Sequence, residues 1–128
     1  MIKRNLIAVL SGLCLLLYVA SANAEENQQA LSSMANIMLN LNHYPSDGEK
    51  KQLGKFISDM SLSSNVRTIA QAMSNLEHTA KDEDKEKLSA IMKDDAASES
   101  EKTLASVIYS VNHKPSSADK EKLSKIAK

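Results

Sequence analysis

Three histidines recur at equal intervals along the chain: His43, His78 and His113 are each 35 residues apart. Histidine is the commonest metal ligand among the side chains, and either nitrogen of its neutral ring can bind a metal. A regular row of three therefore predicts a metal or haem ligand set. The candidate ligands are these three histidines, with nearby oxygen donors from Asp47, Asp82 and Glu83.

A structural role explains the same pattern without a ligand. A histidine in the last turn of a helix is favoured by the helix dipole and by the exposed carbonyl groups there. Stacked helical units also lie about 10 Å apart, whereas a metal binds an imidazole nitrogen at about 2 Å. We therefore expect neighbouring copies not to reach one metal unless the stack curves sharply, and the structural role is the favoured interpretation.

The histidines belong to an internal repeat with a period of 35 residues. The same spacing separates three alanines, three lysines and three leucines: Ala35, Ala70 and Ala105; Lys50, Lys85 and Lys120; Leu53, Leu88 and Leu123. The segment from Asp84 to Ser89 recurs unchanged from Asp119 to Ser124. Repeats of this length are typical of stacked supersecondary units, which we place near residues 29–63, 64–98 and 99–128.

Each unit has the hydrophobic pattern of a helical hairpin. Its first half carries apolar residues at helical spacing, as in Ile69, Ala72, Met73 and Leu76, which predicts one buried stripe. Its second half is charged and has a narrower stripe that includes the repeated leucine. Because a lone hairpin cannot cover these stripes, the units must pack together. We predict an all-α fold of six helices in three tandem hairpins, stacked as a short α-solenoid or as a closed helical bundle.

Local sequence explains how the two helices of a hairpin are joined. Asn42 and Asn112 tolerate the left-handed conformation that ends helices, and the prolines three residues later prevent the helix from continuing. A serine follows each proline, with an acidic residue three positions further on, which resembles a capping box at the start of the next helix. The pairs are Ser46 with Glu49 and Ser116 with Asp119.

The middle unit departs from this pattern. Glu77, Ala80 and Lys81 stand where the other units have Asn, Pro and Ser. We therefore expect a longer or looser joint there, with Asp82 as the helix cap. The middle hairpin should then be the least rigid of the three.

Helical-hairpin units of about 35 residues resemble tetratricopeptide-type repeats in period and plan. The Trp, Gly, Tyr and Pro positions of that consensus are missing here. The resemblance is therefore architectural, and it implies no function.

The first 24 residues have the pattern of a cleavable secretory signal peptide. A basic start at Lys3 and Arg4 precedes an apolar run of roughly 15 residues, which is shorter than the about 20 that span a bilayer. Ala22 and Ala24 then have the spacing of a cleavage site. We predict cleavage after Ala24, no stable membrane anchor afterwards, and one domain over residues 25–128, periplasmic in a Gram-negative cell or secreted.

Cysteine and charge narrow the possible chemistry. The single cysteine, Cys14, lies in the predicted signal peptide, so the mature chain would have no disulfide or thiolate site. Lys3 and Arg4 are two of the 16 basic residues, which leaves 14 against 16 acidic residues after cleavage. We predict no nucleic-acid partner, because such a partner requires a basic surplus. Without a catalytic or cofactor-binding motif, we also predict a non-enzyme that has no cofactor.

Two functional hypotheses from different classes follow. The first is a periplasmic protein-interaction or envelope-stress module, in which the hairpins present a groove or edge to another protein or to a second copy of the chain. The alternative is a periplasmic metal- or haem-binding protein that uses His43, His78 and His113. Metal binding requires these three side chains to converge on one exposed edge, whereas the structural role leaves each within its own turn.

Overall fold

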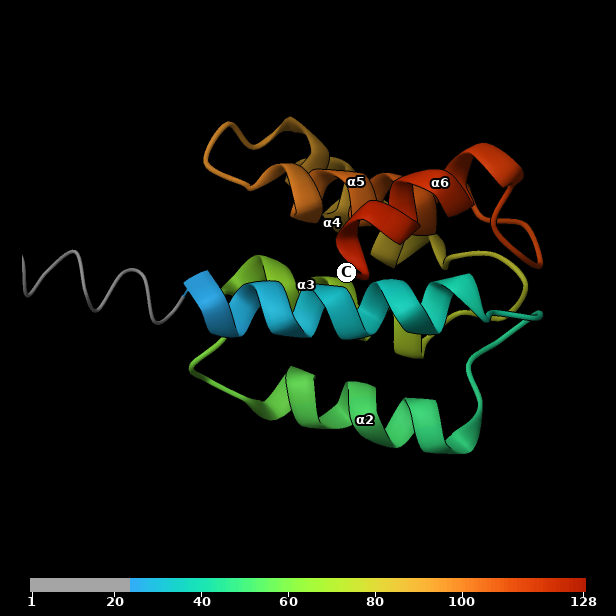
Figure 1. Ribbon diagram of the computed structural model, residues 1–128, viewed down its shortest axis with the longest axis horizontal. Helices are drawn as coiled ribbons and strands as arrows, with labels where there is room; N and C mark the ends of the chain where they lie inside the picture. Colours follow the sequence, from blue (N-terminus) through green and yellow to red (C-terminus); the bar gives the residue numbers. More distant parts are fainter. Residues whose placement is uncertain (1–23) are drawn as a thin grey trace, which may run out of the picture.

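The computed structural model describes residues 24–128, which form six helices (Figure 1). The first helix covers residues 24–39. It is followed by α2 (Asp47–Ser58), α3 (Ser64–Ser74), α4 (Asp82–Lys93), α5 (Glu99–Ser110) and α6 (Ser117–Ile126). The all-α prediction is confirmed. Residues 1–23 of the predicted signal peptide lie outside the described residues.

The helices pair as three hairpins whose joints all lie at one end of the molecule, on the right in Figure 1. The second helices of the hairpins begin at Asp47, Asp82 and Ser117, which are 35 residues apart. The first helix, α3 and α5 therefore run parallel toward that end, and α2, α4 and α6 return in the opposite direction. We call this end the apex; it contains residues 40–46, 75–81 and 111–116.

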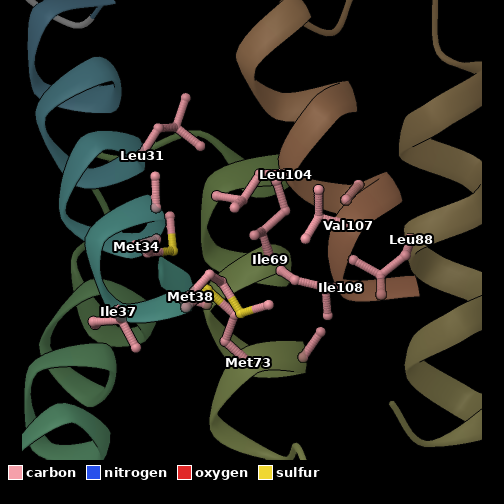
Figure 2. Packing of buried hydrophobic residues seen from close by; sticks show 14 of the residues in the cluster. Leu31, Met34, Ile37, Met38, Ile69, Met73, Leu88, Leu104, Val107 and Ile108 are labelled. Atoms are coloured by element: carbon pink, nitrogen blue, oxygen red, sulfur yellow. The ribbon is translucent and has the colours of Figure 1, made fainter. Parts of the chain in front are cut away.

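The first helix, α3 and α5 bury their apolar stripes against one another. Figure 2 shows side chains from all three, including Met38, Met73 and Ile108, pointing into one shared core. These side chains have no exposed surface, and burial of each contributes about 1.5–3 kcal/mol. The three repeated alanines are also completely buried. Their small side chains allow close packing of the inner helices.

The outer helices each add a narrower apolar stripe to this core. The repeated leucine of each unit, Leu53, Leu88 and Leu123, is completely buried on α2, α4 and α6 respectively. The remaining surface of these helices is largely charged and exposed. No helix in residues 24–128 is both long enough and apolar enough to cross a membrane.

The three hairpins close around a common axis, because the last unit returns to the first. The backbone N–H of His43 in the first hairpin donates to the carbonyl oxygen of His113 in the third, at 2.7 Å. An open stack would leave these terminal units apart. Of the two arrangements that the sequence allowed, the closed bundle is therefore the one that forms.

The predicted serine caps are present at the starts of α2 and α6. The Ser46 hydroxyl accepts from the Glu49 N–H while the Glu49 carboxylate accepts from the Ser46 N–H, which completes a capping box. Ser116 accepts from the Asp119 N–H at 3.1 Å. Each cap occupies a donor that the first turn would otherwise leave unpaired.

The middle joint differs from its prediction, since it has the same length as the first joint and is not capped by Asp82. Helix α4 begins at the same point of the repeat as α2 and α6, Asp82 is its first residue, and its N-cap Lys81 makes no side-chain capping bond. A different contact holds the joint. The buried carboxylate of Asp84 accepts a 3.0 Å hydrogen bond from the side-chain amide of Asn75, which lies just after α3.

Candidate metal centre

Each of the three histidines has a positive backbone φ, at 77° for His43, 70° for His78 and 69° for His113. They are the only described residues other than glycine with this feature. The left-handed conformation was predicted for Asn42 and Asn112, and that prediction is wrong. Histidine, like Asn and Asp, is enriched several-fold in this region of φ, so the residue is one of the few suited to the position.

The histidines also lie beyond the helices and not in their last turns. Helix α3 ends at Ser74 and α5 at Ser110, so His78 and His113 follow their helices by several residues. They therefore do not have the predicted role, in which a histidine in the last helical turn interacts with the exposed carbonyl groups there. Instead, each histidine lies at the tip of a sharp chain reversal.

At the third copy the reversal has the form of the tight three-residue γ-turn, because the Lys114 N–H donates to the Asn112 carbonyl oxygen over 2.9 Å. In the middle copy the bond runs the other way, from the Glu77 N–H to the Thr79 carbonyl oxygen at 3.3 Å. A γ-turn with positive φ at its centre is rare and strained. Conformations of this kind cost about 1–3 kcal/mol per residue, and they cluster at functional sites.

The backbones of the three histidines form a closed ring of hydrogen bonds. His43 N–H donates to His113 O at 2.7 Å, His78 N–H to His43 O at 2.9 Å, and His113 N–H to His78 O at 2.7 Å. Each histidine donates one of these bonds and accepts another, so the ring is complete only when all three turns have formed. This ring fixes the backbones of the three histidines relative to one another.

The three imidazole rings converge at the apex. Their centroids are 5.0 Å apart for His43 and His78, 5.0 Å for His43 and His113, and 4.7 Å for His78 and His113. One ring nitrogen from each lies within 4.8 Å of the other two. The expectation that neighbouring copies are too far apart to share a metal is wrong, because the units close around an axis and do not stack in a line.

One pair of ring nitrogens is already spaced as in a metal site. Zinc binds imidazole at about 2.0–2.1 Å, so two ligands of a tetrahedral ion are separated by about 3.3 Å. The Nδ1 atoms of His43 and His78 are 3.2 Å apart. In the metal-free state one of these nitrogens carries the proton that the other accepts, and a metal would replace that shared proton.

The third histidine has a hydrogen-bonded partner that sets its tautomer. His113 Nδ1 is 2.6 Å from Asn112 Oδ1, an acceptor, which places the proton on Nδ1. The Nε2 atom of His113 is then the free ligand atom. A contact of this kind to the second ring nitrogen commonly orients metal-binding histidines.

The cluster consists of imidazole alone and is open to solvent. His78 and His113 are exposed and His43 is partly exposed. Within residues 24–128, the carboxylates of Asp47, Asp82 and Glu83 are not part of the group. The rings also pack against one another at an exposed tip and not along an apolar cleft, so the geometry suits a single ion better than haem.

No protein-family model, curated protein or solved structure matches this chain. The candidate site therefore stands on its own geometry.

Sequence reasoning named the three ligands but missed the Asn112 contact and the backbone ring. The period of the repeat identified His43, His78 and His113, because only equal spacing distinguishes them from scattered histidines. Two of the histidines, His43 and His113, lie between an asparagine and a proline, which indicated turns, but His78 has no such neighbours. Spacing along the chain cannot show whether repeats close on themselves.

Proposed function

We propose that this chain is an exported helical protein that binds one transition-metal ion through His43, His78 and His113. The observation that carries the proposal is the convergence of the three imidazoles, with one ring nitrogen of each within 4.8 Å of the others. The three residues come from three different hairpins, so chance clustering along the chain does not explain their meeting. We propose binding without a catalytic step.

The ligand set limits which metals would bind. Three neutral imidazoles suit Zn²⁺, Cu²⁺ and Ni²⁺, whereas Ca²⁺ and Mg²⁺ require oxygen ligands. The positive φ of each histidine supports the proposal independently of the distances. Histidine tolerates this backbone conformation, but glycine would adopt it with less strain, so the recurrence of histidine in all three units supports a use for the side chain.

The export part of the proposal rests on the signal-peptide pattern in the sequence, with the periplasm as the compartment. The interaction-module hypothesis, in which the hairpins present a groove or edge to another protein or to a second copy of the chain, stays a prediction.

Calorimetric titration of Zn²⁺ and Cu²⁺ into residues 24–128, which contain the whole described core, tests metal binding. We expect one ion per chain, and a loss of affinity of about 100-fold or more in His78→Gly, which removes one ligand. Glycine suits the positive φ at this position, so the variant should keep its fold. Thr79→Ala, at the neighbouring exposed position, is the matched control and should bind as the unmodified chain does. Absence of binding, or binding that is equal in His78→Gly, would overturn the proposal.

A further inference from the structure

We infer that a metal ion at the three-histidine site keeps a coordination position that faces solvent and binds a small monodentate anion. The inference rests on the proposed metal binding and adds a ligand class to it. It follows from the direction in which the three ligands approach, and from the absence of a fourth donor in the described part of the site.

All three ligands reach the ion from one side. The joints that hold His43, His78 and His113 lie together at the apex (Figure 1), and their backbones are fixed to one another by the hydrogen-bonded ring. An ion that binds nitrogens at about 2 Å holds any two of them at most about 4 Å apart, so the three ring nitrogens, which lie within 4.8 Å of one another, move slightly closer to share it. His78 and His113 are exposed, so the hemisphere of the ion that the three ligands leave uncovered is open to solvent.

The described protein supplies no further ligand to that hemisphere. In residues 24–128, the three histidines alone make up the group of metal-binding side chains at the apex. Their backbone N–H and carbonyl groups are already paired with one another. The Asn112 side-chain oxygen accepts from His113 Nδ1 at 2.6 Å.

The chemistry of such an ion depends on its open position. Metal sites with three protein ligands hold a water or a substrate in the next position, whereas structural zinc sites use four protein ligands. A divalent ion bound by three neutral imidazoles keeps its full positive charge, so it favours an anion over water. The exchange is a simple substitution in which the water leaves as the anion binds, with no redox change.

Cobalt(II) is the probe for this position, because its visible absorption reports the ligands around the ion. Residues 24–128 are loaded with one equivalent of Co²⁺ and titrated with azide, and the same titration is repeated on a Cu²⁺-loaded sample by electron paramagnetic resonance. We expect a shift of the absorption bands that saturates with azide and reverses on dialysis. Thr79→Ala should give the same shift as the unmodified chain.

Two other results separate the inference from the proposed function. If Co²⁺ and Cu²⁺ bind but azide changes neither spectrum, the ion has no exchangeable position, and the inference fails while metal binding stands. If neither ion binds, or if His78→Gly retains them unchanged, the site itself is absent and both proposals fail.

Discussion

The backbone N–H of His43 donates to the carbonyl oxygen of His113 over 2.7 Å, although 70 residues separate the two along the chain. This contact joins the first hairpin to the third. Together with the two backbone bonds that His78, in the second hairpin, makes to His43 and His113, it completes the ring. The residues that close the fold are therefore the same residues that form the candidate metal site. Closure and ligand placement have one structural origin.

The first prediction compares glycine and alanine at His78. Both substitutions remove the imidazole, but only alanine keeps a Cβ at a φ of 70°. A Cβ in a left-handed conformation costs about 1–2 kcal/mol, and the entropy of glycine in the unfolded chain offsets part of this difference. We expect His78→Gly to be more stable than His78→Ala by about 1 kcal/mol, measured by urea unfolding without metal.

The unmodified protein completes this comparison. Strain of about 1–3 kcal/mol at His78 opposes ring contacts worth about 0.5–1.5 kcal/mol, so the metal-free protein should be no more stable than His78→Gly. A His78→Gly chain that unfolds at much lower urea would contradict this prediction, because it would show that the imidazole stabilises the metal-free fold by more than its backbone strain costs.

Metal should stabilise the closed bundle. An ion that binds only the folded state adds about 2.7 kcal/mol at a free concentration of 100 times Kd. For a domain of this size, that corresponds to a rise in Tm of about 10–20 °C, as each kcal/mol shifts Tm by about 4–8 °C. Thermal unfolding with and without Zn²⁺ measures the effect, which should disappear in His43→Gly. An equal rise in both chains would place the metal elsewhere.

Adding a serine cap should stabilise the middle hairpin. Lys81 occupies the N-cap of α4 without a side-chain capping bond, where the other two units have Ser46 and Ser116. A serine cap contributes about 0.5–2 kcal/mol. We expect Lys81→Ser to raise the free energy of unfolding by about 1 kcal/mol. Lys87→Ser, at an exposed position inside the same helix, is the control and should not stabilise.

The Asn75–Asp84 hydrogen bond should be needed for the middle joint. Asp84 is 4% exposed, and its carboxylate is the acceptor for the Asn75 amide. Asp84→Ala leaves this partly buried amide unpaired, which costs about 1–3 kcal/mol. The double variant with Asn75→Ala should lose less than the sum of the two single variants. Strict additivity would mean that the two side chains do not interact.

The carboxyl of Asp59, just after α2, should titrate below its usual range. Hydrogen bonds from the Ser61 hydroxyl, at 2.6 Å, and from the Ser61 backbone N–H, at 3.0 Å, lower the pKa of Asp59 from 3.8. Because the folded pKa is depressed, the associated stability is present above pH 3.8 and is lost as the pH falls through the folded pKa.

Ser61→Ala tests the cause of this shift by NMR titration of the Asp59 carboxyl carbon. The variant should raise the pKa of Asp59 toward 3.8, since the hydroxyl bond is the larger of the two causes. Ser58→Ala, on the same stretch of chain, is the control, because the Ser58 hydroxyl donates to the Gly54 carbonyl and not to Asp59. A pKa that is unchanged in Ser61→Ala would contradict the assignment.

The sequence by itself determined the helices, their pairing into hairpins and the identity of the candidate ligands. Hydrophobic spacing, proline positions and serine caps depend on residues that are close together in the sequence, so they can be recognised without the structure. The buried leucines at positions 53, 88 and 123 and the capping box of Ser46 and Glu49 confirm this level of inference. The 35-residue period selected the three histidines for the same reason.

Only the tertiary structure decided that the three units close and that the histidines meet. Whether repeats stack in a line or around an axis depends on the angle between neighbouring units, which is set by packing across the core. In a line the histidines would be separated by about the diameter of a helix. Around an axis, with each residue at positive φ and bonded to the next, they converge within 4.8 Å.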